Sequence, residues 1–583
     1  MIKEYDIPVP MRDGVNLMVD VYRPDGRGKY PVLLACAMHN KDLQRVEIAE
    51  NLKTGQPAWS TMWYGIIEAG DSKRFVANGY VHVIGQIRGG HKSEGTPNVN
   101  DEWDEYDLLE WIAAQPWCDG NIGMVGLSGY SAVQWKAAAQ GHPALKAIFP
   151  FDASGLYGGG VGFREANPGG VISTFMYHLG LNNSLHMNLD TPPQLPEPVE
   201  EAWQKAMANP DYMMHVHLYN ILTTKGQRDP AIFYTLVFPY ETPEIVAQAE
   251  ERLKKIKIPF YTGAFEGAYT YKVHCQGAQH HFMGIDTAHK KLLFTPPMHS
   301  ERPYHQLHDE ILRWYDYWLK GNDTGIIDEP PVKYWVMGAN TWRYGQDWPL
   351  PETDWVPYYL HSWERLDTKG HLPADSTYVN EPPDAFVQMP PTQTNKIERL
   401  RYMTEPLAED SRVAGPISLT LYASIDETDT NWIVILKDVG PDVSVRTARE
   451  GEREVPDDLF ERELTRGWLK ASYRATDPAR SKPWKPWHYL TADKIQPVVP
   501  GEINEYKIEI LSTANMFKTG HRICLDITCL DLAEGVAGET SVEYITPHVC
   551  SSKTVLHKIY HNHAYPSHLL LPIIPDDCKK EGK

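Results

Sequence analysis

One segment, residues 123–139, constrains the fold more than any other, because a strand, a tight turn and a helix follow one another in it without a break. An apolar run ends at Gly126, small residues surround Ser128, and an alanine-rich stretch follows at once. Such a turn holds a serine hydroxyl clear of a sheet, and the next N–H, that of Gly129, can bind a developing oxyanion. Tyr130 stands at the last glycine of the usual G-x-S-x-G pattern. Taken alone, the segment therefore also fits a plain Ser-Gly connection between a strand and a helix.

Strands and helices alternate around this segment. We expect strands at residues 15–22, 30–37, 80–86 and 122–126, and the last two are short apolar runs typical of strands buried on both faces. Residues 101–114 predict an amphipathic helix that begins with acidic residues and ends before Pro116. This alternation predicts a doubly wound α/β domain.

The character of the sequence changes twice further along the chain. Glycine-rich turns and Met-bearing helical stretches predict an inserted helical subdomain, after which α/β alternation returns at residues 258–263, 291–295 and 308–319. Beyond about Pro349, short β-rich segments between Pro and Gly turns predict an antiparallel β-sandwich or jelly roll. We therefore expect an α/β domain at 1–153 and 249–350, a helical insertion at 154–248 and a β domain at 351–583.

Charge and cysteine usage exclude several classes of protein. A formal net charge of −20 argues against nucleic acid as a partner, because phosphate binding needs concentrated Lys and Arg. No apolar run approaches the roughly 18 residues of a membrane helix, and the N-terminus has no apolar signal core. The seven cysteines are scattered without CxxC spacing, which favours reduced thiols. We expect a cytoplasmic protein without a membrane partner.

A serine nucleophile needs a base and an acid that orients the base. In folds of this kind the order along the chain is serine, acid, histidine, at the carboxyl ends of strands. Glu266 and His299 each follow a strand-like segment in that order. The spacing leaves a competing set open, in which His280 or His281 would act with Asp286.

Two groups of histidines have spacings that a metal ion could use. They are His215 with His217, and His557 with His561 and His563. Neither group has a matching acidic or cysteine partner nearby in the sequence. We therefore expect no metal site and no cofactor.

Segments along nearly the whole chain carry a family resemblance. They are residues 9–17, 86–95, 115–128, 336–343, 515–523 and 568–575. In these segments the chain resembles the cocaine esterase / Xaa-Pro dipeptidyl-peptidase (CocE/NonD) family of serine hydrolases, which includes the α-amino-acid ester hydrolases. The resemblance implies an α/β-hydrolase domain, a helical cap inserted in it and a C-terminal jelly roll. It also implies Ser128 as nucleophile, His299 as base in a Pro-x-x-His loop, and an acid at Glu266.

Three positions depart from the family pattern. Glu266 stands where the family usually has aspartate, and one more methylene still allows its carboxylate to reach a histidine. His39 stands at the place of a tyrosine whose hydroxyl completes the oxyanion hole, and an imidazole can also donate a hydrogen bond there, although a loop histidine with another role fits equally. Ser131 replaces a glycine, and we expect its side chain to crowd the turn slightly.

These residues together predict hydrolysis of a small carboxylic ester or amide through an acyl-Ser128 intermediate, without a cofactor. An Xaa-Pro dipeptidyl-peptidase or an amino-acid ester hydrolase or acyltransferase is an alternative, for which Glu165 or the acids within residues 197–201 would hold a substrate ammonium. A non-hydrolytic biosynthetic or binding descendant is another. Homo-oligomerisation stays open.

Overall fold

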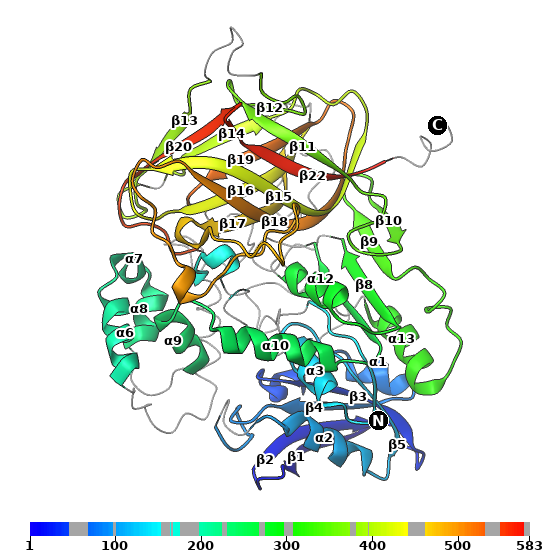
Figure 1. Cartoon of the computed structure of the whole chain (residues 1–583). Helices are drawn as coiled ribbons and strands as arrows, with labels where there is room; N and C mark the ends of the chain where they lie inside the picture. The colour runs from blue at the N-terminus through cyan, green and yellow to red at the C-terminus, as the bar shows by residue number, and fades with distance from the viewer. Residues whose placement is uncertain are drawn as a thin grey trace, which may run out of the picture.

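Two β-sheets, one in each half of the chain, organise the molecule (Figure 1). The computed structural model describes residues 1–45, 68–96, 101–152, 164, 167–174, 197–223, 230–266, 274–296, 307–372, 381–394, 396–440, 461–530 and 548–575.

The first sheet has ten strands in the order β1-β2-β4-β3-β5-β6-β7-β8-β9-β10. The strands from β4 to β9 in this order are parallel, and the pairs β1–β2, β2–β4 and β9–β10 are antiparallel. The bounds are β1 (Ile2–Pro10), β2 (Asn16–Arg23), β3 (Tyr30–Ala37), β4 (Val81–Gln86), β5 (Cys118–Met124), β6 (Leu145–Ile148), β7 (Phe260–Phe265), β8 (Lys290–Thr295), β9 (Val332–Val336) and β10 (Thr341–Gly345).

Helices cover both faces of this sheet. One apolar cluster joins the strands to α1 (Ser72–Ala77) and α13 (His308–Lys320), and another joins them to α2 (Asp104–Ala113), α3 (Gly129–Gln140) and α10 (Pro243–Lys255). The central strands β3 and β4 are buried almost throughout, as their apolar runs predict. The predicted α/β alternation is confirmed in this half of the chain.

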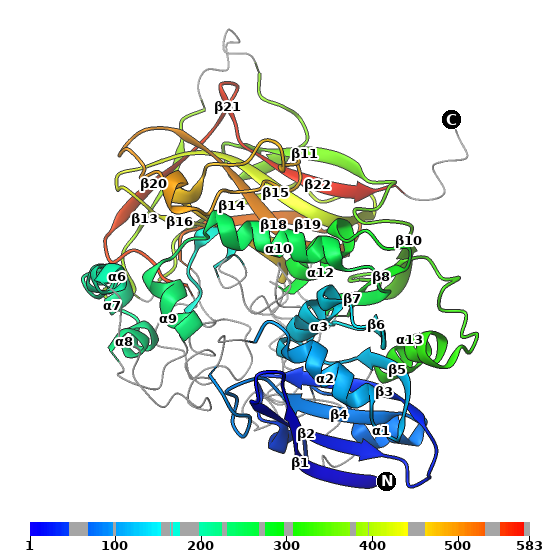
Figure 2. The same cartoon turned by 60° about the horizontal axis from the view of Figure 1, so that its bottom comes forward.

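A group of helices is inserted between β6 and β7. The described members are α6 (Glu197–Met207), α7 (Pro210–Met213), α8 (Val216–Thr223) and α9 (Pro230–Val237), which share an apolar core of their own. In Figures 1 and 2 they stand to one side of the first sheet, whereas α10 lies between α3 and the second sheet. Helix α10 runs unbroken across residue 248. Helix α12 (His274–Gly284) packs on β7 and β8.

The second sheet contains twelve strands and closes on itself, because β22 pairs with both β11 and β15. Its largest apolar cluster fills the interior. The bounds are β11 (Asp354–His361), β12 (Arg365–Asp367), β13 (Asp384–Gln388), β14 (Arg399–Met403), β15 (Ser411–Ile425), β16 (Asn431–Val439), β17 (Glu461–Lys470), β18 (Asn504–Phe517), β19 (Arg522–Thr528), β20 (Val555–Asn562), β21 (Tyr565–Pro566) and β22 (His568–Ile574). Short 3-10 helices lie at Lys41–Arg45, Pro168–Gly170, Ala471–Tyr473 and Ala492–Lys494.

The two sheets meet where β18 passes the end of β9. Met337 donates its N–H to the carbonyl of Ala514 at 3.0 Å and accepts from the N–H of Met516 at 2.8 Å. Apolar residues of both sheets share one cluster at this junction. A strand of the C-terminal half is thereby fixed against the first sheet.

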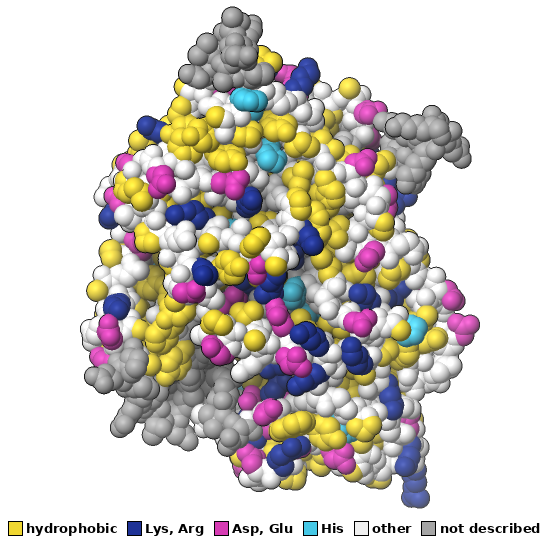
Figure 3. All heavy atoms as spheres, in the orientation of Figure 1, with side chains coloured by type: hydrophobic (Ala, Val, Ile, Leu, Met, Phe, Trp, Pro, Cys, Tyr) yellow, Lys and Arg dark blue, Asp and Glu magenta, His cyan; other side chains and the backbone are white. Residues whose placement is uncertain are grey.

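The helices, the cysteines and the surface charges can be compared with what the sequence predicts about membrane spans, disulfides and charged patches. None of the described helices is long and apolar enough to cross a bilayer. The cysteines within the described ranges are buried and carry free thiols. On the face drawn in Figure 3, basic and acidic side chains alternate and do not form a patch of one sign.

Candidate active site

Ser128 lies in the turn that joins β5 to α3. Its backbone has φ 53° and ψ −112°, a conformation that a residue with a side chain adopts only when its surroundings impose it. Its N–H donates to the carbonyl of Phe151 at 3.2 Å, and the hydroxyl of Ser131 donates to the carbonyl of Ser128 at 2.6 Å. Instead of crowding the turn as expected, the Ser131 side chain therefore adds a hydrogen bond to it.

Glycine is required on the strand side of this turn. Gly126 has φ +128°, and a Cβ there would lie 2.2 Å from the Cβ of Tyr130. Tyr130 itself is fully buried in the apolar cluster under α1 and α13. Tyr130, which replaces the last glycine of the G-x-S-x-G motif, thus packs into the core and does not disturb the tight turn at Ser128.

Glu266 follows β7 directly, at the same edge of the sheet as Ser128. Phe151 bridges Leu127 on one side and Gly263 on the other, so the extended ends of three neighbouring strands are in register. Two strand spacings amount to about 9–10 Å between the backbones of the serine turn and the Glu266 strand. That distance leaves room for an imidazole ring between the two side chains.

The Glu266 carboxylate is held by the C-terminal half of the chain. Its side chain is buried, and the hydroxyl of Thr513 on β18 donates to Oε2 at 3.4 Å. Its N–H donates to the carbonyl of Thr295, the last residue of β8, at 3.3 Å. The junction between the two sheets therefore reaches this carboxylate.

His299 lies outside the described residues. The strand that precedes it, β8, ends at Thr295 beside Glu266. The competing set is separated from this edge, because Asp286 is fully exposed near the amino end of β8. The ring of His281 is buried against Trp135 at 4.1 Å between centroids.

His39 lies against the serine turn. A Cβ on Gly129 would be 3.0 Å from His39 Nε2, so the imidazole packs on the residue whose N–H faces the expected oxyanion. The same Nε2 lies 3.1 Å from Oε2 of Glu68, a buried carboxylate. The carbonyl of Glu68 also accepts from the N–H of Leu127 at 3.0 Å. Sequence reasoning missed Glu68, which belongs to no recognisable motif.

Asp152 was also missed by sequence reasoning. It follows Phe151 at the carboxyl edge, has φ 51°, and donates its N–H to the carbonyl of Gly263 at 2.7 Å. Its side chain is fully buried, and this burial raises the pKa of Asp152 well above its ordinary range although the N–H of Phe265 opposes the shift. A buried carboxyl group whose pKa is raised therefore lies between the Ser128 and Glu266 strands.

The other sequence candidates are placed as follows. Glu200 and Glu201 on α6 face solvent, and Glu201 pairs with Lys205 at 2.9 Å, while Glu165 lies outside the described residues. His557 and His561 do not share a site, since His557 bonds Thr430 and His561 bonds Asp384, and His563 is exposed. His215 is buried, and the side chain of His217 is outside the described set.

Comparison with known proteins gives this geometry a context. A family model described as X-Pro dipeptidyl-peptidase (S15 family) matches residues 13–301, and one for the X-Pro dipeptidyl-peptidase C-terminal non-catalytic domain matches residues 324–570. The cocaine esterase of Rhodococcus sp. (strain MB1 Bresler) is 28% identical, with 98% of each chain covered. A putative serine esterase of Mycobacterium bovis is 25% identical over 97% of this chain and 94% of its own. A crystal structure of a CocE/NonD family hydrolase from Staphylococcus aureus has a TM-score of 0.73 at 22% identity, covering 98% of this chain and 94% of that one.

The fold and these likenesses define the molecule as a serine hydrolase with an N-terminal hydrolase domain and a C-terminal domain built on a closed sheet. More narrowly, the chain belongs to the family of X-Pro dipeptidyl-peptidases and cocaine esterases, the CocE/NonD hydrolases.

Proposed function

We propose that the protein cleaves a carboxylic ester of a small organic molecule through an acyl intermediate on Ser128. The observation that carries this proposal is the strand-to-helix turn, which keeps Ser128 at φ 53° at the carboxyl edge of the sheet. A serine in that place presents its hydroxyl to a bound carbonyl group. The similarity to proteins named as esterases supports an ester as the substrate.

The proposed reaction uses three side chains in sequence. His299 takes the proton of Ser128 as the hydroxyl oxygen attacks the ester carbonyl, and then gives that proton to the departing alcohol. Water, activated by the same histidine, releases the acid product and frees Ser128. Glu266 orients the imidazole and stabilises its charged form, and Thr513 fixes the carboxylate. This chemistry requires no cofactor.

The oxyanion is bound in this proposal by the N–H of Gly129 and by His39. Glu68 acts as a positioning residue, because its buried carboxylate lies 3.1 Å from His39 Nε2 and fixes the direction of the imidazole ring. Nε2 is the nitrogen that faces both Gly129 and Glu68, so in this proposal the Nε2–H bond lies between the Glu68 carboxylate and the substrate oxygen and is shared by them as charge develops. His39 would thus replace the tyrosine that the family resemblance implies.

The finer architecture belongs to the same proposal. We assign the first sheet and its helices to an α/β-hydrolase domain, the helices around α6–α9 to a cap over the acyl site, and the closed sheet to a jelly roll. The parallel strand order and the inserted position of the helices support this partition.

Active-site labelling tests the nucleophile. A fluorophosphonate should modify the wild-type chain once, on the peptide that contains Ser128, and should not modify Ser128→Ala. Ser131→Ala is the matched control, since it removes the neighbouring hydroxyl and should still be labelled. A folded wild-type protein without an adduct would favour a non-hydrolytic descendant of the fold.

Dipeptidyl-peptidase or amino-acid ester hydrolase activity is the second candidate, and the S15 family match favours it. Such a substrate carries an ammonium group that needs a carboxylate in the pocket, and Glu200 and Glu201 are turned to solvent. Rates on p-nitrophenyl esters, amino-acid esters and Xaa-Pro anilides separate the two. A kcat/KM that is highest on Xaa-Pro anilides would replace the esterase assignment.

A further inference from the structure

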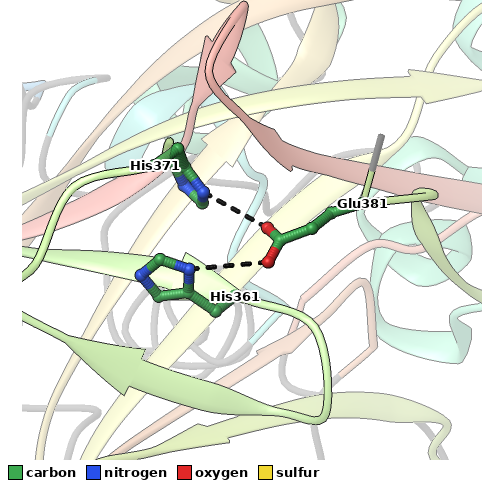
Figure 4. A group of neighbouring side chains, drawn as sticks. All are labelled: His361, His371 and Glu381. Atoms are coloured by element: carbon green, nitrogen blue, oxygen red, sulfur yellow. Dashed lines mark ion pairs between the residues drawn. The ribbon is translucent and has the colours of Figure 1, made fainter. Parts of the chain in front are cut away.

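A cluster of histidines and carboxylates lies in the closed sheet, away from the serine turn. His361 ends β11, His371 follows β12, and Glu381 precedes β13. Figure 4 shows both imidazole rings turned toward the Glu381 carboxylate, with His361 Nδ1 3.7 Å from Oε1 and His371 Nδ1 3.2 Å from Oε2. Within the described ranges, these three side chains place potential ligand atoms within 4.8 Å of one another.

A fourth side chain, from β20, borders the cluster. His561 is fully buried, and its Nδ1 lies 3.4 Å from Oε2 of Glu381. Its other nitrogen, Nε2, lies 2.9 Å from Asp384, whose same oxygen accepts from the hydroxyl of Tyr402 at 2.9 Å. Asp384 therefore fixes the His561 ring so that Nδ1 faces the cluster.

The orientation of the His361 ring is also fixed by a hydrogen bond at its Nε2, which leaves Nδ1 facing the cluster. Its Nε2 lies 2.9 Å from the carbonyl of Lys369, and because a carbonyl only accepts, this nitrogen carries the proton. In the neutral ring, Nδ1 then presents a lone pair toward the Glu381 oxygen. Two lone pairs facing each other are unfavourable unless a proton on Nδ1 or a metal ion lies between them, and a metal ion can satisfy the neighbouring His371 and His561 rings at the same time.

His371 is not held as a structural histidine usually is. Its side chain is 4% exposed, and over the part of the chain that the structure describes its Nε2 is buried without a hydrogen-bond partner. Its polar contact is the Glu381 carboxylate. The polar contact of the His371 ring is thus made within the cluster, to Glu381, and not to a backbone carbonyl or N–H of the described residues.

The spacing of the ligand atoms matches one coordination geometry. In a tetrahedral zinc site with bonds of 2.0–2.2 Å, the ligand atoms are about 3.4 Å apart. The distances from Glu381 to the three Nδ1 atoms are near this value, with 3.2 and 3.4 Å measured to Oε2 and 3.7 Å to Oε1. The ligand atoms of His361, His371 and Glu381 all lie within 4.8 Å of one another, and His561 lies just outside that group. Imidazole and carboxylate together suit Zn²⁺, whereas Ca²⁺ and Mg²⁺ prefer oxygen ligands alone.

We propose that His361, His371 and Glu381 bind one Zn²⁺ ion in the C-terminal domain, and that His561, whose Nδ1 faces Glu381, turns in as the fourth ligand. Four protein ligands leave no open position, as is typical of a structural site. Asp384 and the Lys369 carbonyl form the outer hydrogen bonds that usually orient ligating histidines. The ion ties the end of β11, the segment after β12 and the start of β13 to β20, which lie at the top of the closed sheet in Figure 1, far from α3.

Equilibrium zinc binding on the full chain tests this proposal. The protein is stripped with a chelator, dialysed and titrated with Zn²⁺ against a chromophoric competitor, and bound metal is counted by mass spectrometry. We expect one tight site that is lost in Glu381→Gln, which keeps the side-chain shape, and in His371→Ala. Asp384→Asn should weaken binding about 10- to 100-fold. Co²⁺ bound in place of Zn²⁺ should give the intense visible absorption of tetrahedral coordination.

The controls make the result decisive. The chain has 24 histidines, so only the difference between the wild type and the variants counts. His563→Ala removes an exposed histidine next to β20 and should bind zinc as the wild type does. Circular dichroism checks that each variant is folded. Equal zinc binding by the wild type and Glu381→Gln, or no tight site in the wild type, would overturn the proposal and leave a cluster of protein ion pairs.

Discussion

At the scale of single residues, the oxyanion site depends on a histidine that packs on Gly129 and pairs with Glu68. Removing one oxyanion donor costs about 10²–10³ in kcat, because the bond strengthens only as charge develops on the substrate oxygen. We therefore predict that His39→Ala lowers kcat by about 10²-fold with little change in KM. His39→Tyr should recover most of the activity, since a tyrosine hydroxyl donates from the same place. Steady-state kinetics on a p-nitrophenyl ester would contradict this if His39→Ala kept the wild-type kcat.

Asp152 makes a separate prediction about pH. The unfolded chain ionises this carboxyl above about pH 4, whereas the folded chain keeps it protonated to a higher pH, because burial raises its pKa well above the ordinary value. The contribution of Asp152 to stability is thus complete at low pH and is lost as pH rises toward the folded pKa. Asp152→Asn should make the unfolding free energy rise relative to the wild type as pH increases. Denaturant titrations at several pH values measure this, and Asp119→Asn, at an exposed aspartate on β5, should show no such trend.

Sequence reasoning found the residues that follow strong strand patterns and missed those that do not. Ser128 and Glu266 could be selected because buried apolar strands end beside them. Asp152 follows β6, which has only four residues, so no pattern marked the strand end. Glu68 meets His39 only through the packing of separate segments. The roles of Ser128, Glu266, His299, Gly129 and His39 stay predictions until they are measured.

At the scale of elements, the clearest agreement lies in the buried strands. The strand predicted at residues 30–37 has those bounds as β3, and the helix predicted at 308–319 is α13 with one more residue. Both elements have a clear hydrophobic pattern in the sequence. The strand β3 is a continuous apolar run buried on both faces, and α13 has apolar residues at helical spacing, with Ile311, Trp314 and Tyr315 on its buried face. The proposed zinc ligands could not be predicted in this way, because they come from four separate segments and have no regular spacing in the sequence.

The serine turn provides a prediction about stability at this scale. Gly126→Ala should lower the unfolding free energy by about 2–4 kcal/mol, because φ +128° is unfavourable and the new Cβ would lie 2.2 Å from the Cβ of Tyr130. Gly141, at the end of α3, is the matched control, with φ +72° and open space where an added Cβ would point. Gly141→Ala should cost only about 1 kcal/mol. Equal losses in urea denaturation would show that packing against Tyr130 does not constrain the turn.

At the scale of the whole molecule, both halves bury neutral histidines. Burial lowers the pKa of His82 in the first sheet to about 3 and that of His557 in the second to about 4. Below the ordinary value of 6.5 the unfolded chain binds these protons and the folded chain does not, so stability is lost as pH falls from 6.5 toward the folded values. Each histidine should cost about 2 kcal/mol between about pH 7 and pH 5. His557→Gln should reduce this acid dependence in denaturant titrations, and His563→Gln at an exposed position should leave it unchanged.

The joining of the two halves could not be predicted from sequence. Closure of the second sheet depends on β15 pairing with β22, and the support of Glu266 depends on Thr513 of β18. These contacts link residues more than a hundred positions apart, and no local periodicity encodes them. The strand-rich character of the C-terminal half was predictable, because its alternating segments are local.

The most direct test of the account is the pre-steady-state reaction with a p-nitrophenyl ester. We predict a burst of p-nitrophenol close to one equivalent per chain, with the acyl group mapped by mass spectrometry to the peptide containing Ser128. Ser128→Ala, folded as judged by circular dichroism, should give no burst and no acylated peptide. A burst of the same size in Ser128→Ala, or an acyl group on another residue of the wild type, would contradict the account.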